Sequence, residues 1–185
     1  MVLAAGAGQR FAASGAGEHK LVTSVRGEAL VNHAVRAATA AAVGEVVVVQ
    51  GAVDLTEHVP AGTTLVDNPR WPEGISTSLQ AALDHARARR CSAVVVGLAD
   101  QPGVGPAAWR AVAASPSLPP IAVATYDGRR ANPVRLAEAV WDLLPETGDE
   151  GARAVMRDRP ELVREIPCSG EPWDVDTVED LERWS

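Results

Sequence analysis

Short apolar runs alternate with longer amphipathic segments along most of this chain. Continuous apolar or β-branched runs at 46–49, 64–66 and 93–98, and a weaker one at 121–126, predict strands that are covered on both faces. Between them, apolar residues recur at helical spacing within 30–42, 75–86 and 109–113, and Pro106 suits a first helical turn. This alternation predicts an α/β fold with a mostly parallel central sheet, right-handed crossovers and helices on both faces.

Length and composition predict a folded domain of ordinary size. The chain has 185 residues, 46% of them hydrophobic, and we expect one domain over residues 1–185, with a few residues upstream of Met1 because a central strand usually starts earlier. A net charge of −7 without a basic stripe argues against a nucleic-acid partner, but not against a nucleotide held by a few cations. No apolar run is long enough for a membrane, and no export leader is visible. Two widely spaced cysteines suggest a reducing, cytoplasmic location.

The first apolar run leads directly into a small-residue turn. Gly6 and Gly8 allow left-handed backbone angles and a close approach of a ligand. Successive N–H groups in such a turn favour anions, and Arg10 and Lys20 add positive charge beside it. We interpret the segment as a polyphosphate loop; an ordinary strand-to-helix turn is the alternative. It is not a dinucleotide fingerprint, because Phe11 stands where a third glycine would be, and it lacks the Gly-Lys-Ser/Thr of a Walker loop.

Carboxylates follow the predicted strands at two further places. Ligands of parallel sheets bind beyond the carboxyl ends of strands. Asp100 follows the most apolar run and could hold a divalent cation there, with a helix N-cap or turn role as the alternative. Asp174 and Asp176 would point to one side of an extended segment. The adjoining Thr177 and Asp180 predict a capping box for a last helix.

Several motifs follow one another in order along almost the whole chain. The first is Leu-Ala-Ala-Gly-x-Gly-x-Arg at 3–10, followed by Lys20, and the second is Asp-Asn-Pro-Arg-Trp-Pro-Glu-Gly-Ile-Ser-Thr-Ser-Leu at 67–79. The later motifs are Ala-Asp-Gln-Pro at 99–102, Asn-Pro-Val at 132–134, Gly-Asp-Glu-Gly-Ala-Arg at 148–153 and Asp-Val-Asp-Thr-Val-Glu-Asp-Leu at 174–181. In this order they resemble those of the molybdenum-cofactor cytidylyltransferases, which are MobA/MocA-like nucleotidyltransferases.

The resemblance implies a Rossmann-like three-layer sandwich of the nucleotide-diphospho-sugar transferase type. It implies transfer of CMP from CTP to the terminal phosphate of molybdenum-bound molybdopterin, with release of pyrophosphate and with Mg²⁺ as cofactor. A client molybdoenzyme would be a further partner. Relatives with Leu-Ala-Gly-Gly use GTP, so Ala5 favours CTP here. The segment from Arg10 to Lys20 is longer than usual in that family, and we expect its apparent insertion at 12–17 to be a mobile loop.

The family roles carry over by position. The expected nucleotide-binding residues are Leu3, Ala4, Ala5, Gly6, Gly8, Lys20, Asn68, Ser76 and Ser78. The expected catalytic residues are Arg10, Lys20 and Asp100, the expected metal ligands are Asp100 and Asp176, and the expected second-substrate side carries Asn132, Pro133, Asp149 and Arg153.

Structural alternatives stand beside several of these roles. Pro133 restricts Asn132 to extended angles, so this pair could be only a strand entry. Asp149 could cap a helix that starts at Glu150. The five tryptophans are expected to be core or lid contacts, and His19, next to the predicted phosphate-binding lysine, is the one histidine of interest.

Two other classes of function compete with cytidylyl transfer. One is a guanylyltransferase or another NTP transferase of the same fold. The other is a non-catalytic carrier of the molybdenum cofactor. The four charges of Arg10, Lys20, Asp100 and Asp176 favour catalysis, because a carrier would not need all of them.

Overall fold

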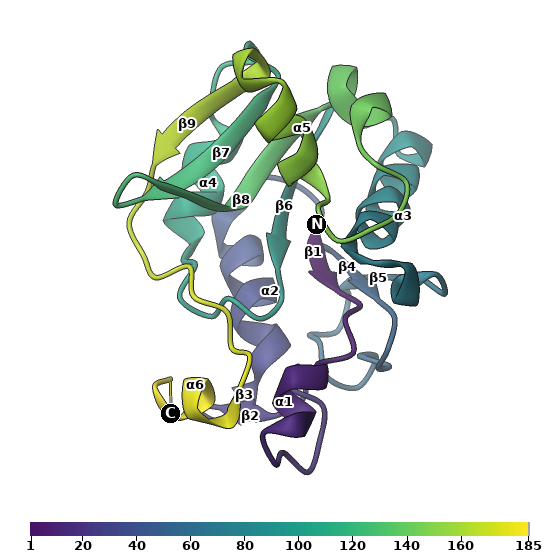
Figure 1. The fold of residues 1–185 in the computed structure, drawn as a ribbon, viewed down its shortest axis with the longest axis vertical. Helices are drawn as coiled ribbons and strands as arrows, with labels where there is room; N and C mark the ends of the chain where they lie inside the picture. The colour runs from purple at the N-terminus through teal and green to yellow at the C-terminus, as the bar shows by residue number, and fades with distance from the viewer. Residues whose placement is uncertain (185) are drawn as a thin grey trace.

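The computed structural model describes residues 1–184 and has a seven-stranded mixed sheet at its centre (Figure 1). The strand order is β5-β4-β1-β6-β8-β7-β9. The strands are β1 (Val2–Ala4), β4 (Val47–Gln50), β5 (Thr64–Asp67), β6 (Ala93–Leu98), β7 (Ile121–Tyr126), β8 (Arg129–Ala137) and β9 (Val163–Pro167). A separate hairpin pairs β2 (Ser24–Val25) with β3 (Glu28–Ala29). The four strands expected at 46–49, 64–66, 93–98 and 121–126 are confirmed.

The sheet is parallel where the sequence predicted it and antiparallel around one strand. β5, β4, β1 and β6 are mutually parallel, as are β7 and β9, whereas β8 runs antiparallel to both β6 and β7. Asp127 and Gly128, with φ of 49° and 76°, join β7 to β8 in the backbone region that two-residue hairpins favour. β8 and β9 are not among the predicted strands, although an Asp-Gly pair is a strong hairpin signal.

A bulge interrupts β8. Val123 pairs with Val134 and Ala124 with Ala131, so the two residues between them on β8 have no partner on β7. These two residues are Asn132 and Pro133. The strand-entry alternative is therefore wrong, because the pair lies inside a strand, at the kind of irregularity where a proline without an N–H costs no ladder bond.

Helices cover both faces of the sheet. The helices are α1 (Gln9–Ala13), α2 (Leu30–Ala41), α3 (Ile75–Ala88), α4 (Pro106–Ala113), α5 (Ala152–Asp158) and α6 (Val178–Glu182), with 3-10 turns η1 (Trp71–Glu73), η2 (Glu138–Leu143) and η3 (Pro160–Leu162). One buried cluster joins alternate strand residues such as Val2 and Val48 to α2 and α4, and the other joins Leu3 and Val49 to α3, η2 and α5. The alternation of side chains along each strand thus divides the core into two layers.

Local predictions about helix ends are confirmed in part. Pro106 opens α4, and Thr177 and Asp180 form the predicted capping box of α6. Two expectations are wrong. The loop expected at 12–17 is helical at its first two residues, which end α1, and α5 starts at Ala152 behind Gly151, so Asp149 does not cap it. Within residues 1–184, no helix combines the length and apolar character that a membrane crossing requires.

Candidate active site

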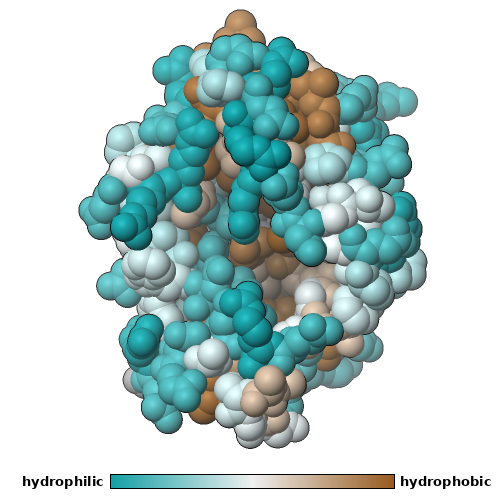
Figure 2. Space-filling model, in the orientation of Figure 1, coloured by the Kyte–Doolittle hydropathy of each residue, from teal (hydrophilic) through white to brown (hydrophobic). Residues whose placement is uncertain are grey.

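A cavity of about 440 Å³ opens at the carboxyl ends of β1 and β6. The chain builds β4 and β5 on one side of β1 and then places β6 on its other side, which makes this edge the switch point where such sheets bind ligands. Figure 2 shows a hollow on this face, with hydrophobic residues inside it and hydrophilic residues around its rim. The lining residues are Leu3 to Phe11, Lys20, Leu21, Trp71, Pro72, Gly74, Ile75, Ser78, Leu98 to Asp100, Asp149 and Asp176.

The glycine turn forms one wall of the cavity. Gly8 has a left-handed φ of 62°, and a Cβ there would lie 3.3 Å from Lys20 Cγ and 3.4 Å from His19 Nε2. The turn therefore needs glycine both for its backbone angle and for the close passage of the lysine side chain.

His19 is hydrogen-bonded to this turn and positions it. The sequence alone predicted no role for His19. Its Nε2 lies 2.9 Å from the Gly6 carbonyl oxygen, and the Leu21 amide donates to its Nδ1 at 3.3 Å. This pattern fits a neutral ring with the proton on Nε2. Burial, together with the charge of Lys20, lowers the pKa of His19, although the Gly6 hydrogen bond opposes this.

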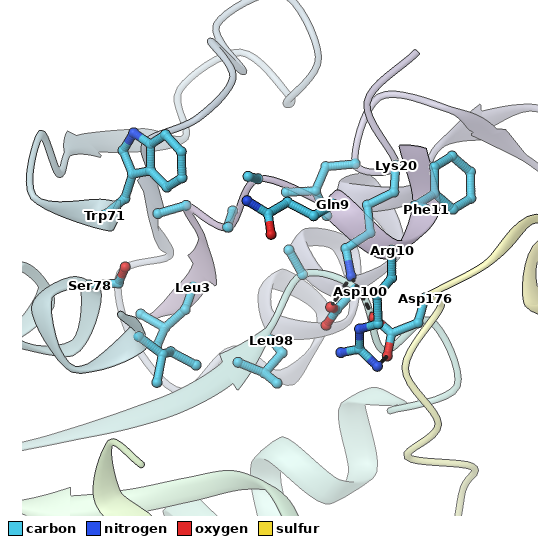
Figure 3. Close-up of a pocket in the computed structure, with 18 of the residues that line it drawn as sticks. Leu3, Gln9, Arg10, Phe11, Lys20, Trp71, Ser78, Leu98, Asp100 and Asp176 are labelled. Atoms are coloured by element: carbon cyan, nitrogen blue, oxygen red, sulfur yellow. Dashed lines mark hydrogen bonds and ion pairs between the residues drawn. The ribbon is translucent and has the colours of Figure 1, made fainter. Parts of the chain in front are cut away.

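Lys20 lies at the centre of an oxygen cluster (Figure 3). Its ammonium donates to Asp100 Oδ2 at 2.7 Å, to the Val175 carbonyl at 3.1 Å and to Asp176 Oδ1 at 3.2 Å. Burial opposes the charge of Lys20, but the charges and hydrogen bonds of Asp100 and Asp176 outweigh it and raise the Lys20 pKa. The sequence separations are 80 and 156 residues, so only the fold creates this cluster.

A second cation completes the charge balance. Arg10 Nη1 lies 2.7 Å from Asp176 Oδ2, and its side chain is 77% exposed. Two cations thus face the two carboxylates of Asp100 and Asp176. A third carboxylate, Asp174, lies close by and accepts a hydrogen bond from Gln101 at 2.8 Å. Burial and then the charge of Asp100 raise the pKa of Asp174.

Trp71 lines the cavity next to Ala5. A Cβ on Gly51 would lie only 2.8 Å from both the Ala5 Cβ and the Trp71 Cβ, so these three residues meet without room to spare. The indole of Trp71 lies beside the glycine turn in Figure 3 and is a lining residue rather than part of the core. Trp109 and Trp141, by contrast, are buried core residues, as expected.

The predicted polar contacts from α3 and from Asn68, which follows β5, divide into two groups. Ser78 lines the cavity. Asn68 does not; its buried amide donates to Thr77 Oγ1 at 2.9 Å and Ser78 Oγ at 3.0 Å and accepts from the Arg70 amide. Ser76 is also buried, and its Oγ accepts from the Gly151 amide. Asn68 and Ser76 therefore lie behind the cavity wall and stabilise it through these hydrogen bonds.

Three of the four predicted second-substrate residues line cavities, and the cavities involved are three. Asp149 lines the cavity already described. Asn132 and Arg153 line both a small apolar cavity under the 148–153 loop and a larger one, of about 930 Å³, beside the β7–β8 hairpin. Pro133 lines none of the three. Gln101, for which the sequence alone predicted no role, lines the larger cavity and directly follows Asp100, which lines the first cavity, just beyond the end of β6.

The site offers a divalent cation a partial set of ligands. Asp100 and Asp176 supply carboxylate oxygens, and Asp100 Oδ1 is a buried oxygen that has no hydrogen-bond partner among the described residues 1–184. Among residues 1–184, no group of three or more His, Cys, Asp or Glu side chains could hold a metal by itself. Two carboxylates fit Mg²⁺, which commonly takes its remaining ligands from phosphate and water.

A glycine turn, two cations and two carboxylates at the switch point of such a sheet define an NTP transferase site. The chain belongs to the family described as the MobA-like NTP transferase domain, and the match covers residues 1–164.

Three relatives extend this comparison. A curated relative, nicotine blue oxidoreductase of Paenarthrobacter nicotinovorans, is 32% identical over 99% of this chain and 94% of its own length. The crystal structure of an Rv0371c homologue from Mycobacterium sp. strain JC1 superposes with a TM-score of 0.81 at 28% identity, over 98% of this chain and 91% of that one. Rv0371c of Mycobacterium tuberculosis H37Rv, crystallised with manganese, has a TM-score of 0.76 at 25% identity, over 99% and 95% of the two chains.

Proposed function

We propose that this protein transfers CMP from CTP to the terminal phosphate of a molybdopterin-type acceptor and releases pyrophosphate. The observation that carries the proposal is the cavity that joins the glycine turn to Lys20, Asp100 and Asp176. It places anion-binding amides, two cations and two possible metal ligands around one space at the end of β1.

The residues of the site would act by positioning and by charge. An acceptor phosphate oxygen attacks the α-phosphorus, a new P–O bond forms, and the bond to the leaving pyrophosphate breaks. The attacking group is already anionic, so no general base is needed. Bringing two unit charges to 4 Å costs roughly 4 kcal/mol at an effective dielectric of about 20. Arg10 and Lys20 supply the positive charge that offsets this repulsion.

A divalent cation fits the same proposal. Asp100 and Asp176 would hold it, and it would supply charge stabilisation on the phosphate oxygens. The manganese in the crystals of Rv0371c supports a divalent metal in this family, and we propose Mg²⁺ for this chain.

Ala5 supports CTP as the nucleotide. Its buried methyl group lies next to Gly51 and beside Trp71. It therefore narrows the part of the cavity in which a base would lie. A pyrimidine, which is smaller than a purine, suits this narrower part of the cavity. The variant Ala5→Gly should therefore raise the rate with GTP relative to CTP.

The acceptor would enter from the larger cavity. Arg153 lines it, and the guanidinium of Arg129, at its hairpin end, forms no hydrogen bond or ion pair within residues 1–184. These guanidiniums suit an anionic group on the acceptor.

The test is pyrophosphate release with CTP or GTP, with and without molybdenum-loaded molybdopterin. The proposal expects release only with the acceptor, faster with CTP, and lost in Asp100→Asn. Asp142→Asn serves as a matched control, because that carboxylate is 95% exposed and, within the described part of the chain, pairs only with Arg87. A preference for GTP would identify the guanylyltransferase alternative, and nucleotide or cofactor binding without release would identify the carrier.

The name of the curated relative supports a second candidate, an oxidoreductase, because 32% identity extends over almost the entire chain. NADH or NADPH oxidation with nicotine blue, measured beside pyrophosphate release, separates the two. Oxidation without any nucleotidyl transfer would contradict the transferase proposal.

A further inference from the structure

Lys20 occupies a place that a metal ion would need. Its ammonium has three N–H donors, and all three are used, by Asp100, Asp176 and the carbonyl of Val175. The three oxygens come from two segments and surround one cation. Lys20 is almost completely buried there, with 8% of its surface exposed.

The oxygen cluster does not depend on Lys20 for its shape. The Val175 amide donates to the Asp100 carbonyl at 2.9 Å, which fixes the two segments side by side. The Asp176 amide donates to Asp180 Oδ2 at 3.2 Å, within the capping box of α6. These two hydrogen bonds do not involve Lys20, so they keep Asp100 and Asp176 together even when the lysine leaves.

The Lys20 side chain also has a second direction available to it, into the cavity. Its side chain passes next to Gly8, where the missing Cβ leaves room, and it lines the same cavity as the anion-binding turn. Anionic phosphates in that cavity would attract both Lys20 and Arg10, whose side chain is mostly exposed.

From these contacts we infer that Lys20 is an internal competitor of the divalent cation. Without nucleotide, its ammonium neutralises the carboxylates and keeps the metal away. When a triphosphate draws Lys20 into the cavity, the oxygens become available, so metal and nucleotide bind together. Lys20 is thus a positioning residue that makes metal binding depend on nucleotide. The nucleotide part of this inference rests on the proposed function, whereas the competition between Lys20 and the metal does not.

Direct Mn²⁺ binding to the full-length protein without nucleotide, measured by calorimetry or by electron paramagnetic resonance of free Mn²⁺, tests the competition. Lys20→Met should bind Mn²⁺ at least about tenfold more tightly than wild type, because a competing unit charge is gone and the carboxylates remain. Removing a residue from a metal site usually weakens binding, so the sign of the change is informative. Equal or weaker binding by a folded Lys20→Met protein overturns the inference.

Two further variants keep the test decisive. If Lys20→Met does not fold, Lys20→Gln carries it: loss of the ammonium charge should again tighten Mn²⁺ binding several-fold, and equal or weaker binding overturns the inference. Arg183→Gln is the matched control, because it removes an exposed arginine from a different carboxylate, Asp180, and should leave Mn²⁺ binding unchanged. A gain in Arg183→Gln equal to that of the test variant would show a general charge effect and overturn the inference.

Coupling to nucleotide is measured separately with a non-hydrolysable CTP analogue. The analogue should tighten Mn²⁺ binding more in wild type than in Lys20→Met, because only wild type must first release its lysine. Equal coupling in the two proteins overturns the nucleotide part. If the analogue does not bind at all, the proposed function fails while the Mn²⁺ result without nucleotide still stands.

Discussion

Asn68 offers a sharp test of how the cavity wall is built. Its side chain makes three hydrogen bonds, to Thr77, Ser78 and the Arg70 amide, in a place that is 4% exposed. Each such bond contributes about 0.5–1.5 kcal/mol net, so Asn68→Ala should lower the free energy of unfolding by about 3 kcal/mol. In a domain of this size that corresponds to a fall in Tm of about 6–12 °C.

The assay is thermal and urea unfolding followed by circular dichroism. Asn32→Ala is the matched control, because the amide oxygen of Asn32 is buried without a hydrogen-bond partner and its loss should cost little. Well below Tm, CTP affinity of Asn68→Ala should fall only a few-fold, through the loosened Ser78. A Tm within about 2 °C of wild type would refute the bracing role of Asn68. A large loss of CTP affinity at unchanged stability would favour direct contact with the nucleotide.

Three other substitutions probe the packing and charge of the site. Gly97→Ala places a Cβ 2.5 Å from the Trp109 ring and should cost about 1–3 kcal/mol in urea unfolding, whereas Gly17→Ala, in open space, should cost little. Gly74→Ala combines a φ of 105° with a clash against the backbone of Gly148, and should lower stability by about 3 kcal/mol or more, again by urea unfolding. The raised pKa of Asp174 means that the folded state binds a proton more readily than the unfolded state, so this group lowers stability above its ordinary pKa of 3.8. Asp174→Asn should therefore be more stable than wild type at pH 7, by less than about 1 kcal/mol because solvent still reaches part of Asp174 and screens its charge, and this advantage should disappear below about pH 4 in a pH series of melts.

Local sequence patterns predicted those parts of the fold that local physics controls. The apolar runs at 46–49 and 93–98 became strands, because a strand buried on both faces needs apolar side chains on each of them. The capping box of Thr177 and Asp180 formed, because both partners lie within one turn of the chain. The glycine turn at Gly6 and Gly8 likewise lines the cavity, as its backbone freedom suggested.

Such local patterns did not predict which strands pair with one another when they lie far apart along the chain. The antiparallel insertion of β8 between β6 and β7 depends on long-range pairing of strands. In addition, the bulge at Asn132 and Pro133 interrupts the alternation of side chains by which a strand is recognised in a sequence. The small-residue segment after Arg10 was predicted to be a loop. Its first residues instead belong to helix α1, in which Phe11 is buried in the core.

The sequence by itself determined the α/β class, the glycine turn and the charged residues that a phosphate site requires. Only the tertiary structure decided that Lys20 lies between Asp100 and Asp176, and that Asn68 faces the wall rather than the cavity. The reason is physical: the direction and charge balance of a polar side chain depend on partners that the fold brings within about 3 Å, and those partners can be far away along the chain.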